Sequence, residues 1–392
     1  MAELAGDLPG ELVTEILDRL PVESLLRCRS VSKRWRYIID SREFVRSHLA
    51  RSFESTANLT LFFRHSSSLY CIDLTSLLRH GGVAEMNYPL MCYSDQIRIL
   101  GSCNGLLCIS NAADDVVVWN PATRKHKFLP YSAVDVRRSS VFSVCVYGFG
   151  YDERRDDYVL LRLVQLVTEP IESEVSIYSL KDNAWRRLKD MPYSLVYPRK
   201  MGVFVCGHLH WIMTRELVSD SANLLVAFDF RIENFKVVDQ PEGIDNTLDM
   251  DLSVLGGCLC LSINRNHMGV DVWIMKEYGL RDSWSKLFSI PQPEVARPLG
   301  FVRPLAYAEN DRRVLVRQDS KNLILYDLET KGMERVDING MPNSFEAEIC
   351  LRTLVSVDDY GGYTKKKQQE AEEINNRTKR DDFLSVGFKL VL

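Results

Sequence analysis

An aromatic residue recurs about every fifty residues through most of the chain, each time after a run of β-branched or other apolar residues. The six positions are Tyr70, Trp119, Tyr178, Phe228, Trp273 and Tyr326. They are separated by 49, 59, 50, 45 and 53 residues, and a proline follows each of them in the same repeat. Because the region consists of short alternating patterns typical of strands, two markers with one period indicate a six-bladed β-propeller. We expect the aromatic side chains to form the core between blades and not a ligand cage.

Each repeat has room for four strands. In two of the repeats the expected strands are 98–101, 106–109, 116–120 and 127–129, and then 250–255, 258–263, 270–275 and 285–289. A glycine-containing pair often precedes the second strand, as in Asn104-Gly105, Cys206-Gly207 and Gly256-Gly257. Such pairs suit tight hairpin turns, because the central residues of these turns need positive φ.

The two ends of the repeat region predict how the ring closes. Five complete sets of strands fit between Arg98 and Pro342. The strands left over are 59–63 and 69–73 on the N-terminal side, and 346–357 and 383–392 on the C-terminal side. We expect them to join as the sixth blade, because closure by strands from both ends removes exposed sheet edges. Residues 358–382 are then a charged insertion, and deleting the closing strand 383–392 should open the ring.

The first fifty residues have a different, helical pattern. Leu12, Ile16 and Leu20 recur at i, i+4 and i+8, so one face of the first helix is apolar. Pro21 ends that helix, because the residue before a proline is disfavoured in the α region, and two more apolar clusters follow before residue 40. A three-helix unit of this size exposes more apolar side chain than it can bury, so we expect a partner.

Several residue pairs of this helical segment form an ordered motif. They are Leu8-Pro9, Glu11-Leu12, Ile16-Leu17, Leu20-Pro21, Ser24-Leu25 and the closing Val31-Ser32-Lys33-Arg34-Trp35. Together they resemble the F-box, which implies docking on a Skp-type adaptor and, through it, on a cullin-based ubiquitin ligase. The residues implied for adaptor binding are Leu8, Pro9, Leu12, Ile16, Leu17, Leu20, Pro21, Leu25, Leu26, Val31 and Trp35. The alternative is an ordinary helical lid, which the proline positions and the closing tryptophan disfavour.

Composition and charge limit the class of protein. The 392 residues are 46% hydrophobic and 26% charged, and the net charge of −4 gives no sign of a nucleic-acid-binding surface. The N-terminus has no signal-peptide pattern, and no apolar run is long enough to span a membrane. The ten cysteines are scattered through strand-like segments. We therefore expect a soluble protein of the cytoplasm and nucleus. Residues 365–367 and 379–380 could form a nuclear signal, but the interspersed acidic residues favour a solvated insertion.

The sequence offers one candidate metal site. Cys206, His208 and His210 alternate along a strand and therefore share one face, as zinc ligands could. No fourth ligand stands nearby, so an ordinary blade strand is the favoured interpretation. The sequence has neither a phosphate-binding glycine loop nor a G-x-S-x-G elbow. We expect a non-catalytic protein without a metal or cofactor.

A second resemblance covers nearly the whole chain. GSCNGLLCIS, VVVWNPATRKHKFLP and YGFGYDERRDDYVLL resemble the F-box-associated, kelch-like propeller, and we place the F-box at 1–50 and the propeller at 51–392. DMDLSVLGGCLCL, VWIMKEYGLRDSW and TKRDDFLSVGFKLVL are similar to the plant F-box proteins called constitutive expressers of pathogenesis-related genes. That likeness implies a substrate receptor that targets nucleotide-binding, leucine-rich-repeat (NLR) immune receptors for ubiquitination and so restrains plant defence.

Target binding is expected on the propeller, because loops on a rigid scaffold commonly carry function. Tyr193, Tyr197, Arg199 and Lys200 combine the aromatic and arginine character that is enriched at interaction hot spots. Three alternatives remain open: a ligase-bound lectin that recognises glycans, a ligase-independent scaffold, and a copper enzyme of the kelch-oxidase type. The last needs Tyr and His ligands, and the seven His residues are dispersed.

Overall fold

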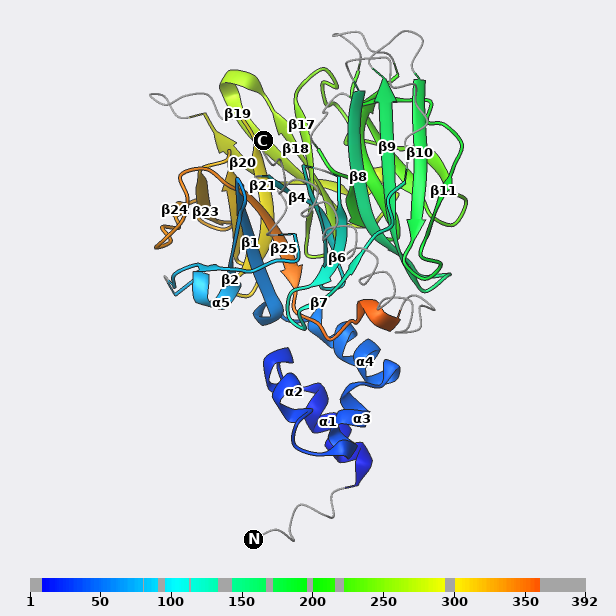
Figure 1. Ribbon diagram of the computed structural model, residues 1–392. Coiled ribbons are helices and arrows are strands. Elements are labelled where there is room, and N and C mark those ends of the chain that lie inside the picture. Colours follow the sequence, from blue (N-terminus) through cyan, green and yellow to red (C-terminus); the bar gives the residue numbers. More distant parts are fainter. Residues whose placement is uncertain are drawn as a thin grey trace, which may run out of the picture.

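The computed structural model describes residues 9–79, 81–90, 96–112, 114–132, 143–166, 172–195, 200–215, 222–292 and 300–359. In these residues a small helical module lies against one face of a ring of six β-sheets (Figure 1). None of the described helices has the length and apolar character needed to cross a membrane.

Four helices form the N-terminal module: α1 (Gly10–Asp18), α2 (Val22–Cys28), α3 (Lys33–Ile39) and α4 (Arg42–Ser52). Ser32 and Ser41 cap the starts of α3 and α4, because their hydroxyls accept hydrogen bonds from the backbone N–H groups of Trp35 (3.1 Å) and Phe44 (3.3 Å). The sequence pattern predicts the first three helices. The fourth was not predicted, and it begins where the Ser41 cap starts a new helix that leads toward the propeller.

The six antiparallel sheets are numbered here as blades 1 to 6. Blade 1 consists of β4 (Ile97–Cys103), β5 (Leu106–Asn111), β6 (Val116–Asn120) and β7 (Lys125–Phe128). Blade 2 consists of β8 (Ser143–Asp152), β9 (Asp157–Leu166), β10 (Glu172–Ser179) and β11 (Ala184–Arg187). In blade 3, β12 (Ser194–Leu195) and β13 (Val203–Val205) both pair with β14 (His208–Thr214), which is followed by β15 (Leu224–Asp229) and β16 (Asn234–Val238). Blade 4 is β17 (Met250–Leu255), β18 (Cys258–Asn264), β19 (Gly269–Met275) and β20 (Trp284–Pro291); blade 5 is β21 (Val302–Ala308), β22 (Arg313–Gln318), β23 (Asn322–Asp327) and β24 (Met333–Arg335); blade 6 is β25 (Glu346–Leu351), β1 (Leu59–His65), β2 (Ser68–Asp73) and β3 (Ala84–Glu85). Short helical segments are η1 (Thr56–Asn58), α5 (Leu74–Leu77), η2 (Asn266–Met268), η3 (Arg281–Ser283) and η4 (Val357–Asp359).

Six apolar clusters stabilise the ring, one at each contact between neighbouring blades. Because side chains alternate along a strand, each strand serves two contacts. In β5, Leu106 and Cys108 pack toward blade 2, whereas Leu107 and Ile109 pack toward blade 6. Strands buried on both faces need apolar residues at successive positions, which explains their continuous apolar runs.

The six repeated aromatic residues lie in six different clusters, so each contact between blades contains one of them. Each residue is on the third strand of its blade and packs toward the preceding blade: Tyr70 on β2, Trp119 on β6, Tyr178 on β10, Phe228 on β15, Trp273 on β19 and Tyr326 on β23. Four of them are at most 3% exposed, and Tyr70 and Trp273 are partly buried. The prediction of an inter-blade core is confirmed.

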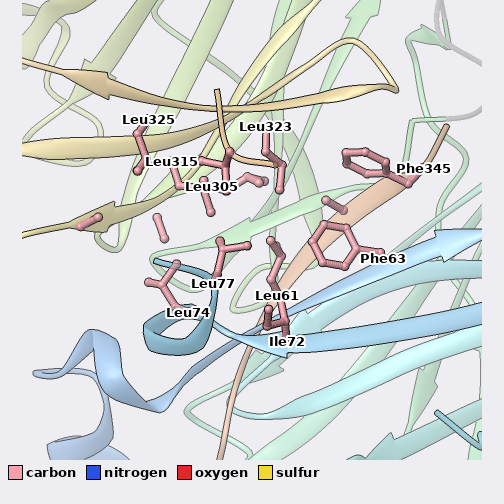
Figure 2. Close-up of a cluster of buried hydrophobic side chains, with 14 residues drawn as sticks. Leu61, Phe63, Ile72, Leu74, Leu77, Leu305, Leu315, Leu323, Leu325 and Phe345 are labelled. Carbon is pink, nitrogen blue, oxygen red and sulfur yellow. The ribbon is translucent and has the colours of Figure 1, made fainter. Parts of the chain in front are cut away.

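Antiparallel pairing of β1 with β25 closes the ring, from Leu59 opposite Leu351 to Arg64 opposite Glu346. The last pair is also an ion pair, with Arg64 Nη2 2.6 Å from Glu346 Oε1. Behind the pairing, the rings of Phe63 and Phe345 meet edge to face with centroids 5.3 Å apart, inside a cluster shared with blade 5 (Figure 2). Strands from both ends of the chain therefore close the propeller, as predicted.

The composition of blade 6 differs from the sequence-based expectation. The predicted closing strand 383–392 lies outside the described residues, together with the charged insertion from residue 360 onward. In the described part, the fourth strand is β3, in which Glu85 pairs with Tyr70 and Ala84 with Cys71. The pattern analysis missed β3, because two residues are too few to show alternation. The effect of deleting 383–392 stays a prediction.

The predicted hairpin turns have the expected backbone. Asn104 and Gly105 have φ of 50° and 84°, which gives the left-handed geometry of a two-residue hairpin turn. Gly105 is required for a further reason, since a Cβ at this position would collide with the side chain of Thr353. The turn of blade 1 is therefore in close contact with the segment that follows β25.

Replacing Phe63 by alanine tests the closure of the ring. Phe63 is fully buried in the cluster between blades 5 and 6, so Phe63→Ala should lower the free energy of unfolding by about 3–5 kcal/mol in urea titrations. The matched control is Phe128→Ala, because the Phe128 side chain is 48% exposed at the outer strand of blade 1. An equal loss of unfolding free energy in the two variants would contradict a special role for the contact between blades 5 and 6.

Candidate functional site

Helix α1 has apolar residues on two faces. Val13 and Leu17, one turn apart, are 6% and 1% exposed and pack inside the module. Leu12 and Ile16, also one turn apart, are 46% and 54% exposed. Full burial of such side chains is worth about 1.5–3 kcal/mol each, so a partner that covers them gains binding free energy. The outer face of α1 is therefore the candidate docking surface.

Exposure divides ten of the eleven predicted docking residues into three groups. Pro9, Leu12, Ile16, Pro21 and Val31 are exposed, and Leu20, Leu26 and Trp35 are partly buried. Leu17 and Leu25 are at most 1% exposed inside the module, and Leu8 lies outside the described residues. In this structure Leu17 and Leu25 are buried inside the module. The assignment of the eleven residues to adaptor binding stays a prediction.

The core of the helical module is completed by the propeller. Leu354, which follows β25, is 8% exposed and belongs to the same apolar cluster as Val22, Leu25 and Phe44. Ala122, in the turn after β6, packs against this cluster from the propeller side. The apolar partner expected from the sequence is thus supplied in part by the same chain.

We call residues 352–357 the joint, because this segment links the module and the ring. The Arg352 guanidinium pairs with Glu23 of α2 (2.8 Å) and with Asp73 at the end of β2 (3.2 Å). It also donates a hydrogen bond to the carbonyl oxygen of Ala57 (2.6 Å), in the linker between α4 and β1. One cation therefore connects the module, the linker and blade 6.

Asn120 fixes the joint from the side of blade 1. Its side chain is fully buried, and its Nδ2 donates to the carbonyl oxygens of Thr353 (3.1 Å) and Val355 (2.7 Å). Its Oδ1 accepts hydrogen bonds from the N–H groups of Ala122 (2.9 Å) and Thr123 (3.2 Å). A single amide thus satisfies backbone groups of both the turn and the joint.

Helix α4 provides a further attachment. Arg42 and Arg46 both pair with Asp156 of blade 2, and the Arg46 contact is 2.8 Å. Val45 and Leu49 pack against the cluster between blades 1 and 2, which also contains Val355 and Val357 of the joint. The docking surface of α1 is therefore held in a fixed orientation relative to the propeller.

The structure describes two of the four residues predicted for target binding. Tyr193 packs against the cluster between blades 2 and 3, and its carbonyl oxygen accepts a hydrogen bond from Gln165 (3.0 Å). Lys200 is partly buried and its Nζ is 2.7 Å from Asp251 Oδ1. Tyr197 and Arg199 lie outside the described residues. The assignment of these four residues to target binding stays a prediction.

Comparison with known protein families agrees with this division of the chain. The F-box domain model matches residues 6–47, and the F-box associated beta propeller domain model matches residues 63–372. The chain belongs to the F-box proteins with an F-box-associated propeller. The helical module is its F-box, which implies binding to a Skp-type adaptor, and proteins of this substrate-adaptor family are generally non-catalytic.

Three relatives of this F-box protein come from Arabidopsis thaliana. F-box protein CPR1 is 36% identical over 414 aligned positions, which cover 98% of this chain and 99% of the relative. F-box protein At4g22390 is 32% identical and covers 99% of this chain and 100% of its own length. F-box/kelch-repeat protein At3g23880 is 31% identical and covers 90% of this chain and 96% of its own.

The histidines considered as metal ligands have other bonds in the F-box protein. His208 Nε2 is 3.1 Å from Asp229 Oδ2, and its Nδ1 is 2.6 Å from the carbonyl oxygen of Cys206. His210 lies between the Val203 carbonyl oxygen (3.1 Å) and the Tyr278 hydroxyl (2.8 Å). Burial lowers the pKa of His210 to about 3, so this ring is neutral. Within the described residues, no group of three or more His, Cys, Asp or Glu side chains has an arrangement suited to a metal ion.

Pattern analysis missed the polar residue that follows four of the six aromatic residues. These residues are Asn120, Ser179, Asp229 and Asp327, and in each the side-chain oxygen accepts backbone N–H hydrogen bonds of the next turn. Such short polar side chains stabilise turns by copying a backbone acceptor. The aromatic–polar pair was a detectable signal in the sequence. The second role of Asn120 at the joint was not, since its partners are 233 and 235 residues away.

Replacing Asn120 by alanine tests the joint of the F-box protein. The change leaves the buried carbonyl groups of Thr353 and Val355 without their donor, so Asn120→Ala should lower stability by about 1–3 kcal/mol. Amide hydrogen exchange should also become faster in residues 352–357. Asn234→Ala is the control, because Asn234 is exposed at the start of β16. Unchanged exchange in the joint would contradict this account of the attachment.

Proposed function

We propose that this protein is the substrate-recognition subunit of an SCF-type (Skp–cullin–F-box) ubiquitin ligase that marks target proteins for degradation. The observation that carries the proposal is the exposed pair Leu12 and Ile16 on an F-box fixed to a propeller. Neither side chain is needed for the core of the module. Their exposure is accounted for by a partner that binds the outer face of α1.

The proposed mechanism is proximity. The F-box binds the adaptor and the propeller holds the target, so that a separate conjugating enzyme transfers ubiquitin to a target lysine within reach. The protein itself forms no covalent bond with ubiquitin or with the target. Arg352, Asn120 and the α4 contacts matter for this mechanism, because they fix the orientation of the adaptor surface relative to the propeller.

The proposed targets are NLR immune receptors, and the proposed outcome is restraint of plant defence in the cytoplasm and nucleus. Support comes from the resemblance to the constitutive expressers of pathogenesis-related genes, and from 36% identity to F-box protein CPR1 over nearly the full length of both chains. On the propeller, Tyr193, Tyr197, Arg199 and Lys200 are the proposed target contacts.

Adaptor binding can be tested with a variant that leaves the F-box core intact. Leu12→Ala/Ile16→Ala should weaken binding to a purified Skp-type adaptor at least about 30-fold, which corresponds to about 2 kcal/mol. The melting temperature should be unchanged, because both side chains are largely exposed. Met268→Ala is the control, since Met268 is 65% exposed in η2 of the propeller. Wild-type protein that does not bind the adaptor would exclude the ligase mechanism and favour the scaffold.

The proposed target class makes a separate prediction in plant cells. Co-expression of the wild-type chain should shorten the half-life of a tagged NLR receptor, and Leu12→Ala/Ile16→Ala should not, although the propeller still captures the receptor. Cycloheximide-chase immunoblots measure the half-life, and immunoprecipitation measures capture. Equal receptor half-lives with both forms, or no capture, would contradict the target assignment. Capture that is lost after enzymatic deglycosylation of the receptor would favour the lectin.

A further inference from the structure

A group of charged side chains lies near the starts of the inner strands of blades 4, 5 and 6, on the face remote from the F-box. The inner strand β25 begins on this face at Glu346 and runs toward the F-box, where it leads into the joint (Figure 1). Asp251 on β17 and Arg303 on β21 lie near the starts of the inner strands of blades 4 and 5. The described residues of this face therefore include an axial cluster of cations and carboxylates.

Three of the axial charges satisfy one another. The Asp251 carboxylate receives two bonds from Arg303, at 3.0 Å from Nε and 2.9 Å from Nη2, and is 2.7 Å from Lys200 Nζ. Burial alone would raise the pKa of Asp251, but the two cations outweigh burial and hold the pKa well below its usual range. Asp251 is therefore ionised, and its carboxylate is already paired with Arg303 and Lys200.

Arg317 on β22 is different, because it has no such partner. It is 6% exposed, its Nε is buried without an acceptor, and it forms no hydrogen bond or ion pair with any described residue. One face of its guanidinium lies over the ring of Phe301, with Cζ 4.9 Å from the ring centroid. Unlike Nε, its two Nη atoms are not fully buried, so they remain within reach of solvent.

The position of Arg317 costs stability. It stands directly opposite Arg303 in the β21–β22 register, and like charges in cross-strand pairs repel. Burial, together with repulsion from Arg303, lowers the pKa of Arg317 to about 10. A buried cation without an ion-pair partner is destabilising, so a requirement of the fold does not explain why arginine stands here.

The nearby carboxylates do not remove the excess of positive charge. Glu346 is already paired with Arg64, and Glu348 is not within ion-pair distance of Arg317. Burial raises the pKa of Glu348, and the nearby Arg303 and Arg317 oppose that shift.

We propose that Arg317 is the centre of an axial binding site for an anionic oxygen group, a carboxylate or a phosphate monoester, on a side chain of the target protein. The planar guanidinium, stacked on Phe301, offers its free edge for two parallel hydrogen bonds to such a group. Arg303 and Lys200 add positive charge beside it. The inference rests on the proposed role as a substrate receptor, and it names the chemistry that the propeller recognises.

The test uses the purified full-length chain and three small probes at constant ionic strength. N-acetylglutamate amide supplies a carboxylate, N-acetyl-O-phosphoserine amide supplies a phosphate monoester, and N-acetylserine amide is the neutral control. The melting temperature is followed as a function of probe concentration to obtain apparent dissociation constants. The tighter of the two anionic probes identifies the source of the anion.

Matched variants separate a binding role from a structural one. Arg317→Gln should weaken the anionic probe at least tenfold and, without probe, should melt at the wild-type temperature or above. Arg317→Lys keeps the charge and most of the stem, and should bind with intermediate affinity because the two-bond geometry is lost. Arg335→Gln should bind like wild type, since Arg335 is exposed on β24 and pairs with Asp337.

Two results would overturn the proposal. One is an equal response of the wild-type protein and Arg317→Lys to the anionic probes, which would show general charge screening. The other is a lower melting temperature of the Arg317 variants combined with no effect of the anionic probes on the wild type, which would show a structural arginine. Adaptor binding is measured on the same samples. A wild-type protein that binds the adaptor but neither anionic probe refutes this inference, whereas a wild-type protein that binds an anionic probe but not the adaptor refutes the ligase mechanism.

Discussion

The pairing of β1 with β25 is the constraint on which the rest of the molecule depends. It joins residues from opposite ends of the described chain, and without it blades 1 and 5 would each lose a neighbour. The strand that makes this pairing also continues as the joint, so Leu351 is followed at once by Arg352 and Leu354. Closure of the ring and attachment of the F-box are therefore consequences of one strand.

This arrangement explains how the F-box and the propeller stabilise each other. The F-box cluster lacks enough apolar residues of its own and includes Leu354, while the turn of blade 1 uses Asn120 to bind the carbonyl groups of the joint. Each part supplies groups that the other leaves unsatisfied. For the proposed role as a substrate receptor, this mutual dependence matters because it holds the adaptor surface and the axial face of the propeller together.

The features that could be predicted from the sequence are those that local periodicity dictates. Tyr178 and Phe228 follow apolar runs because strands between blades are buried on both faces, and Asn104-Gly105 marks a turn that needs positive φ. The amphipathic pattern and prolines likewise located the F-box helices. The joint was not predictable, because it is formed by pairs such as Asn120 and Thr353, 233 residues apart, and has no periodic pattern. The isolation of Arg317 was hidden for the same reason: the sequence shows an arginine in a strand, but not which carboxylates reach it.

Some residues serve the fold and others serve partners. The two kinds are distinguished by whether their apolar surface and polar groups find contacts within the chain itself. Phe63 and Asn120 have all their contacts inside the molecule, so selection for stability alone explains them. Ile16 leaves apolar surface in solvent, and Arg317 is a buried cation without an ion-pair partner among the described residues. Selection for stability alone would replace both. The two proposed partners, an adaptor at the F-box and an anionic group at the axis, would account for the presence of these two residues.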